Sequence, residues 1–363
     1  MEFIDRLERI PLYPKAETYE FGGELVKLAS NETPWAPHPD VRAAIEAQTG
    51  NLNRYPDPAN TRLRTALAER YDLAPEWIAV GNGSCEILLA AAQAMLEPGA
   101  EIVYAWPSFS MYPHLAGMSG ARAVTVPLDP AGRHDLEAMG REVSAATRLV
   151  IVCNPNNPTG TALPVEAIGE FAASLPAHVA LVIDEAYVEF NLTQDESESV
   201  ELVRRHPNLV VLRTFSKVYG LCGLRAGYAL GSPDFREAVD RVRQPFSVNM
   251  LVQAAATEAL RHQDEVARRV ERTVAARLAI EQGLDARGLR YSESQANFAW
   301  IDLGDRDEDF VVRALAGQGV IVRAGKHLGQ EGFLRVTYGT EHENERFLAA
   351  LDTAIGGRAT TGP

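Results

Sequence analysis

The sequence predicts an α/β protein with a large domain built on a mostly parallel sheet, a smaller α+β domain and an N-terminal arm. Short apolar runs alternate with helical stretches at residues 102–104, 123–126, 149–153, 179–183 and 209–212. Near-continuous apolar runs are typical of strands that are covered on both faces. After Pro245 helical periodicity dominates and two or three strands follow, whereas the first forty residues are rich in proline. We therefore expect an arm over 1–40 that packs with the small domain, a large domain over 41–244 and a small domain over 245–363.

Length and charge limit the classes of function. With 363 residues, 46% of them hydrophobic, the chain can bury a sizeable core in more than one lobe. A formal net charge of -14 argues against nucleic acid or an acidic membrane surface as a partner, because phosphate binding needs an excess of lysine and arginine. No segment approaches the roughly 18 uninterrupted apolar residues of a membrane span.

The cysteines and the N-terminus predict a cytoplasmic protein without a metal site. Cys85, Cys153 and Cys222 are widely spaced, with neither a CxxC pair nor a cysteine–histidine spacing typical of metal sites. We interpret them as reduced thiols. The first nine residues carry acids where a secretory signal needs a basic start.

The arm is expected to carry a short strand and to lead into two helices. Residues 25–29 could form the strand, and a turn explains the polar cluster 30–34 that follows. One helix is predicted over 40–49 with Asp40 as its N-cap, and another over 61–71.

A glycine-rich turn between a strand and a helix is a candidate anion site. The strand is predicted at 77–80 and the helix at about 86–96, with Gly81-Asn-Gly83-Ser84-Cys85 between them. Free backbone N–H groups and the helix dipole point at such a turn. Glycine also occurs in many turns for conformational reasons alone, so the turn by itself leaves both interpretations open.

Polar or aromatic side chains follow four of the predicted strands. In parallel sheets, ligands bind beyond the carboxyl ends of the strands, so these segments could converge on one crevice. The residues concerned are Phe109, Asn157, Asp184, Tyr187, Ser216 and Lys217.

Lys217 lies where a strand ends, just before a segment with three glycines. Taken alone, a solvated loop lysine is the simpler interpretation, because lysines are mostly exposed. The functional interpretation is a nucleophile toward an aldehyde, with Arg225 lowering the pKa of the amine. Its strand-end position, shared with Asn157 and Asp184, favours the functional interpretation.

The C-terminal part is expected to be mixed helix and strand. Helical periodicity runs from about 251 to 284, strands are predicted at 298–301, 320–322 and 333–336, and a helix at about 343–355 closes the chain.

A series of short motifs in order supports a family resemblance. They are Ser30-Asn-Glu, Asn53-Arg-Tyr-Pro, Gly81-Asn-Gly-Ser, Pro107-Ser-Phe-Ser-Met-Tyr, Cys153-Asn-Pro-Asn-Asn-Pro-Thr-Gly, Asp184-Glu-Ala-Tyr, Thr214-Phe-Ser-Lys through Arg225, Gln295-Ala-Asn-Phe and Leu334-Arg-Val-Thr. With them the chain resembles the fold-type I pyridoxal-phosphate aminotransferases, most closely the histidinol-phosphate aminotransferase family and its aromatic amino acid aminotransferase relatives. The resemblance implies a large domain of the seven-stranded type and pyridoxal 5'-phosphate as cofactor.

The resemblance also implies roles around the cofactor ring. Lys217 would form the internal aldimine with the cofactor aldehyde, and Asp184 would keep the pyridine nitrogen protonated. Asn157 and Tyr187 would hydrogen-bond the ring hydroxyl, and Phe109 would stack on the ring. Lys217, Asp184 and Tyr187 are the expected catalytic residues.

The cofactor phosphate would be held by the glycine turn and by basic and hydroxyl side chains. The residues implied are Gly83, Ser84, Cys85, Ser216 and Arg225, with Tyr55 reaching the cofactor of the neighbouring subunit in a homodimer with shared sites. Cys85 departs from the family, which often has aspartate at that position, so only its backbone N–H is expected to contribute.

Substrate recognition is expected from two arginines and the arm. Arg335 would clamp the substrate carboxylate or the corresponding acidic group, because its forked geometry suits carboxylate and phosphate alike. Arg323 would be the second basic contact, although a surface arginine at a strand end explains its position equally well. Tyr13 and Asn31 on the arm complete the expected pocket.

The predicted reaction is ping-pong transamination between histidinol phosphate and 2-oxoglutarate, which belongs to histidine biosynthesis. The nearest alternative is an aromatic amino acid aminotransferase, and a decarboxylase of the threonine-phosphate type is a third possibility within the fold. A non-catalytic binding module that kept the fold is the alternative from another class; the presence of Lys217, Asp184, Asn157 and Arg225 argues against it.

Overall fold

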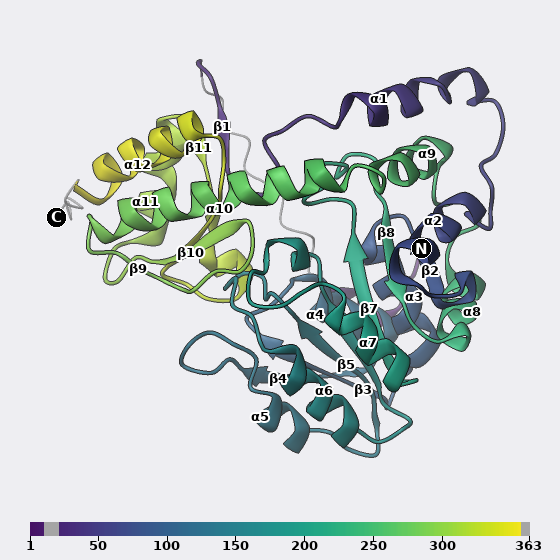
Figure 1. The fold of residues 1–363 in the computed structure, drawn as a ribbon. Helices are drawn as coiled ribbons and strands as arrows, with labels where there is room; N and C mark the ends of the chain where they lie inside the picture. Colours follow the sequence, from purple (N-terminus) through teal and green to yellow (C-terminus); the bar gives the residue numbers. More distant parts are fainter. Residues whose placement is uncertain (11–21, 357–363) are drawn as a thin grey trace.

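A seven-stranded, mostly parallel sheet organises the larger part of the molecule (Figure 1). The structure is a computed structural model that describes residues 1–10 and 22–356. The strand order is β2-β8-β7-β6-β5-β3-β4. The strands are β2 (Ile78–Gly81), β3 (Glu101–Trp106), β4 (Arg122–Pro127), β5 (Thr147–Cys153), β6 (Ala180–Asp184), β7 (Leu209–Thr214) and β8 (Gly227–Leu230). The predicted α/β class and the mostly parallel sheet are confirmed; β8, antiparallel to both of its neighbours, was not predicted.

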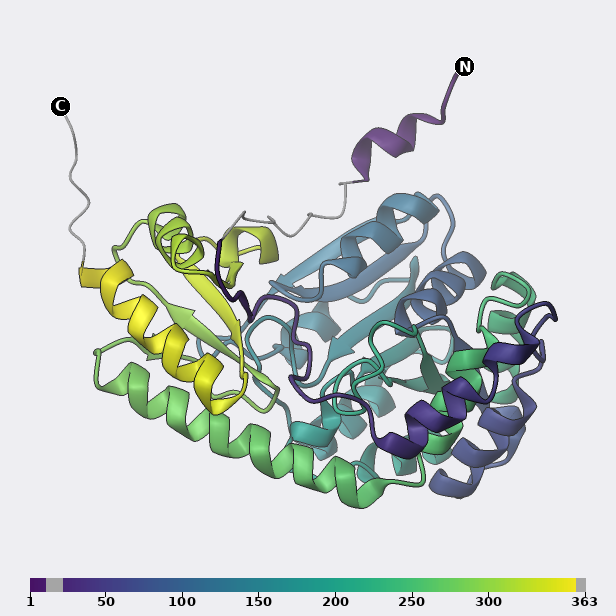
Figure 2. The same cartoon turned by 90° about the horizontal axis from the view of Figure 1, so that it is seen from above.

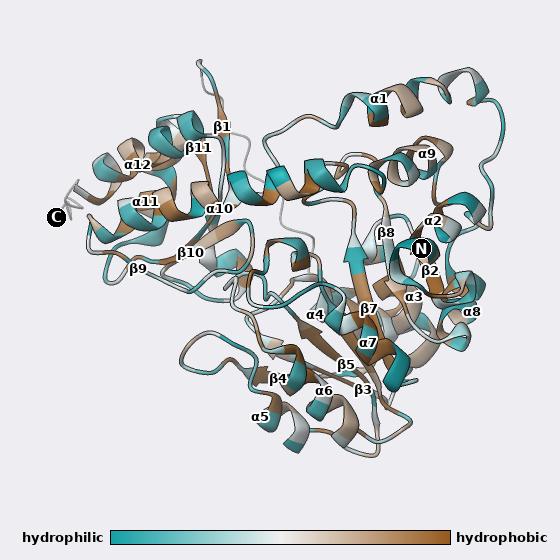
Figure 3. Cartoon of the chain, viewed as in Figure 1, coloured by the Kyte–Doolittle hydropathy of each residue, from teal (hydrophilic) through white to brown (hydrophobic). Residues whose placement is uncertain are grey.

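Helices cover both faces of this sheet, and alternate strand residues enter one core or the other. On β3, Val103 lies in the core with α2, α5, α6, α7 and α9, whereas Tyr104 lies in the core with α3, α4 and α8. Figure 3 shows β3, β5 and β7 as largely hydrophobic. This two-sided burial explains why the strands appear in the sequence as apolar runs. The helices are α2 (Thr61–Tyr71), α3 (Ser84–Met95), α4 (Met111–Ser119), α5 (Leu136–Arg141), α6 (Val165–Ser174), α7 (Glu198–Arg205), α8 (Pro233–Val242) and α9 (Met250–Ala259).

A second sheet forms the C-terminal part, with strand order β12-β13-β10-β9. Its own apolar core includes Ile280, Leu334 and Phe347. Figure 2 shows α10 running alongside both parts of the molecule. The elements are β9 (Arg290–Tyr291), β10 (Phe298–Asp302), β12 (Arg323–Ala324), β13 (Phe333–Thr337), α10 (Gln263–Asp285), α11 (Glu308–Gly317) and α12 (Glu341–Gly356).

The described part of the arm joins the C-terminal part through one short strand pair. β1 (Val26–Lys27) pairs in parallel with β11 (Val320–Ile321), and α1 (Pro39–Glu46) then packs on α9. The division into an arm and two domains at residues 40 and 244 stays a prediction. Five 3-10 helices complete the described elements: η1 (Asp5–Arg9), η2 (Thr49–Asn51), η3 (Pro75–Trp77), η4 (Val188–Phe190) and η5 (Gly325–Leu328).

Several predicted element boundaries are wrong. The helix expected from 251 to 284 is two helices, α9 and α10, separated at residues 260–262. Asp40 does not cap α1, because the N-cap is His38, whose Nδ1 accepts a hydrogen bond from the Asp40 N–H at 3.3 Å. The strands β9 and β12 were missed because two residues are too short to show a period. No helix within 1–10 and 22–356 combines the length and the apolar character that crossing a membrane requires.

Candidate active site

A cavity of about 430 Å³ opens beyond the carboxyl ends of β5, β6 and β7. Because these strands are parallel neighbours, the segments that follow them meet at one edge of the sheet, as the sequence analysis expected. The arm, the start of α3 and strands β12 and β13 supply the remaining walls. The predicted site residues that line the cavity are Asn31, Ser84, Cys85, Phe109, Asn157, Asp184, Tyr187, Ser216, Lys217, Arg225, Arg323 and Arg335.

Lys217 follows β7 and points its amine at the arm. Nζ donates to the carbonyl oxygens of Ser30 and Asn31, each at 3.3 Å, and lies 5.5 Å from the centre of the Tyr187 ring. Burial lowers the pKa of Lys217 to about 8, and the positive charge of Arg335 acts in the same direction. Arg225 was offered for this charge effect when Lys217 was considered alone and was then assigned to the cofactor phosphate; the cation that contributes most is Arg335. The amine therefore loses its proton at a lower pH than an ordinary lysine, in the range just above neutral.

Asp184 ends β6 and is buried, with 3% of its surface exposed. Its Oδ2 accepts a hydrogen bond from the hydroxyl of Tyr112 at 2.9 Å, whereas Oδ1 has no hydrogen-bond partner among the described residues. Burial raises the pKa of Asp184 to about 6, although the Tyr112 bond opposes the shift. A buried carboxylate oxygen without a partner is costly, so the site is built to receive a cationic or N–H donor there.

Asn157 and Tyr187 are tied to groups that come from other parts of the chain. The Oδ1 of Asn157 accepts from Nη1 of Arg335 at 2.6 Å, and the hydroxyl of Tyr187 accepts from Nδ2 of Asn31 at 2.9 Å. Burial raises the pKa of Tyr187 above its usual value. The Tyr187 hydroxyl therefore stays protonated, and the hydrogen bonds fix the direction of both side chains.

Asn31 itself is anchored in the second sheet. Its N–H donates to Oγ1 of Thr337 at 2.9 Å, and its carbonyl accepts from Nδ2 of Asn297 at 3.1 Å. The residue is buried and has φ of 55°, a left-handed conformation that asparagine tolerates. The arm thus forms a fixed wall of the cavity.

The start of α3 and Arg225 lie together at the cavity and offer groups that suit an anion. The first-turn N–H groups of Ser84 and Cys85 have no intrahelical partner and carry the positive end of the helix dipole. Nη1 of Arg225 donates to Oγ of Ser216 at 3.3 Å. Gly227 lets β8 approach, since a Cβ there would lie 2.2 Å from the backbone nitrogen of Ser84. Burial raises the pKa of the Cys85 thiol, which keeps it protonated.

Phe109 also lines the cavity. It contacts Tyr112 edge-on, with ring centroids 5.7 Å apart. Tyr112 was quoted in a motif but received no role, and its hydrogen bond to Asp184 could not be inferred because the hydroxyl reaches across from α4 to β6.

Two arginines oppose each other across the β12–β13 ladder. Arg323 and Arg335 are direct register partners, so their side chains leave the same face of the sheet toward the cavity. Arg335 is buried and donates from Nη2 to the carbonyl of Ala29 at 2.7 Å. Like charges directly opposite one another are unfavourable unless an anion is bound between them.

Gly83 and Tyr55, two predicted site residues, do not line the cavity, and two polar residues that line it were missed. Tyr55 is 81% exposed and stacks on Phe246 with centroids 4.6 Å apart, and Tyr13 lies outside the described residues. Glu32 and Cys222 line the cavity without having been predicted, and their charge and thiol lie close enough to affect Lys217. The position of Glu32 directly after Asn31 was an available signal.

Comparisons with known proteins agree on the family. The family described as aminotransferase class I and II matches residues 23–351. An aromatic amino acid aminotransferase of Thermobifida fusca is 44% identical over 340 residues, which cover 91% of this chain and 94% of that protein. A histidinol-phosphate aminotransferase 2 of Ralstonia nicotianae is 44% identical over 342 residues, or 93% of this chain and 91% of that protein. The crystal structure of histidinol-phosphate aminotransferase from Sinorhizobium meliloti with pyridoxal-5'-phosphate has a TM-score of 0.88 at 29% identity, covering 98% of this chain and 97% of that one.

Proposed function

Because the chain belongs to the class I and II aminotransferases, we propose that it is a transaminase that moves an amino group between glutamate and histidinol phosphate. Its cofactor is pyridoxal 5'-phosphate. The observation that carries the choice of substrate is the opposed pair Arg323 and Arg335 in the cavity.

The described residues fit this cofactor. The unpartnered Oδ1 of Asp184 suits a protonated ring nitrogen, and the start of α3 with Arg225 suits a phosphate. Asn157 and Tyr187 offer polar groups on the side of the ring hydroxyl, and Phe109 offers an aromatic face. When bound, pyridoxal phosphate would supply an aldehyde and an electron-withdrawing ring that accepts the electrons of a broken Cα–H bond.

Protein groups would perform the proton chemistry. Asp184 would hold a proton at the ring nitrogen, which a buried carboxylate does well because its charge is little screened. Lys217 would bind the aldehyde at rest and, once displaced by the substrate amine, take the proton from the substrate Cα. The pKa of Lys217, lowered to about 8, increases the fraction of Nζ that is unprotonated and able to accept that proton above neutral pH.

The arginine pair favours substrates with two anionic centres or one phosphate. Glutamate would place its two carboxylates on Arg335 and Arg323 in one half-reaction. In the other half-reaction the phosphate of histidinol phosphate would use both guanidinium groups. An aromatic amino acid would instead place an apolar ring beside the charge of Arg323.

An aromatic amino acid as amino donor is the second candidate. Its support is the identity of 44% to the Thermobifida fusca protein over nearly the whole chain. Measuring kcat/KM for histidinol phosphate and for phenylalanine, each with 2-oxoglutarate as acceptor, decides between the two candidates. A preference for phenylalanine would refute our choice.

An arginine variant sharpens this test. Replacing Arg323 by Gln should lower the single-turnover rate with histidinol phosphate roughly 10–100-fold, as expected when one charged hydrogen-bond pair is lost. The rate with phenylalanine should change little. Arg313→Gln, an exposed arginine on α11, is the matched control.

We also propose a homodimer that shares its active sites. The support is the exposed apolar group formed by Leu52, Tyr55 and Phe246, which a second copy would cover. Mixing inactive Lys217→Ala and Tyr55→Ala subunits should restore activity, because one site of each hybrid dimer then has both side chains intact. No gain over the separate variants would contradict shared sites. The cytoplasm remains the proposed location, supported by three free cysteines.

A further inference from the structure

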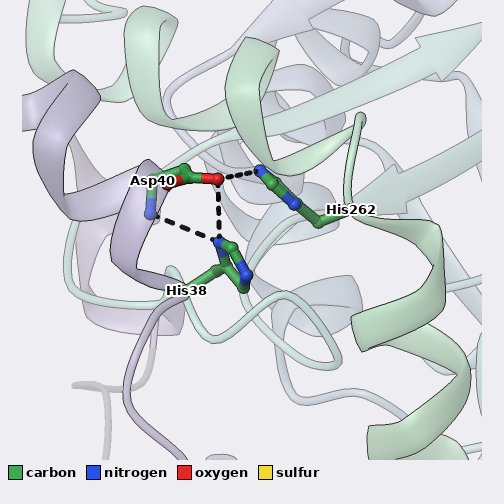
Figure 4. A group of neighbouring side chains, drawn as sticks. All are labelled: His38, Asp40 and His262. Atoms are coloured by element: carbon green, nitrogen blue, oxygen red, sulfur yellow. Dashed lines mark hydrogen bonds and ion pairs between the residues drawn. The ribbon is translucent and has the colours of Figure 1, made fainter.

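Two histidines and an aspartate from distant parts of the sequence meet at the junction of α1, α9 and α10 (Figure 4). His38 and Asp40 lie at the start of α1, and His262 lies between α9 and α10. The Oδ2 of Asp40 lies 3.7 Å from Nδ1 of His38 and 3.5 Å from Nε2 of His262. The two imidazole rings stack with centroids 3.9 Å apart.

The two distances from the Asp40 oxygen to the histidine nitrogens, 3.7 and 3.5 Å, are close to the edge length of a tetrahedral metal site. With Zn–N and Zn–O bonds of about 2.0–2.2 Å, neighbouring ligand atoms of a tetrahedral site lie roughly 3.4 Å apart. The Oε1 of Glu258 lies 3.2 Å from the same Nε2 of His262 but does not belong to this group of ligand atoms, so a water would complete the coordination. Two imidazoles with one carboxylate form a ligand set that suits zinc.

The arrangement is less well explained without a cation. Nδ1 of His38 accepts the Asp40 N–H in a long hydrogen bond of 3.3 Å, and a carboxylate oxygen of Asp40 lies 3.7 Å from the same nitrogen. A divalent cation between them would bind the His38 lone pair and the Asp40 carboxylate together, in exchange for that hydrogen bond.

The site lies next to the residues that follow Lys217 in the chain. A small hollow there is lined by His38 and His262 and by Val218 and Tyr219, the two residues directly after Lys217. Arg269 links the same parts, donating to the carbonyl of Val218 at 2.9 Å and to that of Ala36 at 2.7 Å. A cation bound here would hold the segment that runs from the active-site wall to α1.

We propose that His38, Asp40 and His262 bind one Zn²⁺ ion, which fastens the start of α1 to the α9–α10 connection. The sequence analysis expected no metal site, because the two histidines are far apart in the chain and no cysteine accompanies them. The proposal does not depend on which amino donor the enzyme uses.

Zinc binding to the untagged holoenzyme tests the proposal. The enzyme is stripped with a chelator, titrated with Zn²⁺ against a chromophoric competitor, and then passed through a desalting column for metal analysis. We expect one retained Zn²⁺ per chain and a rise in the thermal midpoint on adding zinc. Hydrogen exchange of residues 36–46 should slow in the loaded protein.

Conservative variants locate the ion. His38→Asn removes the imidazole and keeps a residue that caps helices well, and His262→Asn and Asp40→Asn remove the other ligands. Each should weaken zinc binding by at least about 10–100-fold, the loss known for outer-shell partners. Each should also abolish the zinc-dependent rise in the midpoint. The exposed His178→Asn is the matched control and should behave like the parent.

Two results would overturn the proposal. One is the absence of stoichiometric zinc in the parent enzyme. The other is zinc binding that is unchanged in the folded variants, which would place the ion elsewhere. If His38→Asn fails to fold, the Asp40→Asn and His262→Asn variants give the same decision.

Discussion

Replacing Asp184 by Asn should stabilise the cofactor-free protein and disable the holoenzyme. Asp184 is buried, and its pKa rises from 3.8 to about 6 on folding. The folded protein therefore holds a proton that the unfolded chain has released, and stability falls as the pH rises through this range. At 1.36 kcal/mol per pH unit, the charge costs about 3 kcal/mol above pH 6.

The amide removes that cost while its oxygen keeps the Tyr112 hydrogen bond. After the cost of the new buried N–H group, we expect a gain of about 1–3 kcal/mol in the free energy of unfolding at pH 7.5. At pH 5 the carboxyl is mostly protonated in the folded protein, so the gain should fall by roughly half. Urea unfolding of the cofactor-free protein, followed by tryptophan fluorescence at both pH values, measures this difference.

The holoenzyme should respond in the opposite sense. Without the carboxylate no charge holds the proton at the ring nitrogen, and the half-reaction with glutamate should slow by about 100–1000-fold. A variant that is less stable than the parent at pH 7.5, or whose stability difference does not change with pH, would refute the electrostatic reasoning. Asp305→Asn, at an exposed loop aspartate, is the control and should show neither effect.

Three further changes test the site and its support. Gly227→Ala would place a Cβ 2.2 Å from the Ser84 nitrogen, so pyridoxal phosphate affinity should fall roughly 10–100-fold in a spectroscopic titration. Gly317→Ala, on α11 and in open space, should change it little. Arg213→Met removes the buried ion pair in which Nη2 of Arg213 lies 2.8 Å from Oε2 of Glu185, and it should lower the free energy of unfolding measured in urea by about 3–5 kcal/mol. An effect below 1 kcal/mol would contradict this. Burial lowers the pKa of Lys217 to about 8, so the rate at which the cofactor-free protein captures pyridoxal phosphate should rise about tenfold per pH unit below pH 7 and level off above pH 8. Trapping with borohydride measures this rate. A flat rate from pH 6 to 9 would show that another group limits the reaction.

Sequence reasoning was strongest for elements whose burial has a simple period. The run 149–153 is apolar because β5 is covered on both faces, and α2 was predicted with the boundaries that the structure has. β8 was missed because four residues after a glycine-rich segment show no period, although it lies between β2 and β7 in the sheet.

The sequence by itself determined that Asn157, Asp184 and Lys217 share one edge of the sheet. They follow parallel strands, and the carboxyl ends of neighbouring parallel strands point the same way whatever the rest of the chain does. The candidate anion subsite at the start of α3 was predictable for a similar reason, since a glycine turn before a helix leaves free N–H groups locally.

Only the tertiary structure decided which distant groups complete the site. The bond from Arg335 to Asn157, the bond from Asn31 to Tyr187 and the meeting of His38 with His262 join segments far apart in the chain. Such contacts depend on how the second sheet and the arm pack against the first, and no local period encodes that packing. For this reason Lys217 was predicted as the reactive amine, but the part that Arg335 plays in lowering its pKa was not.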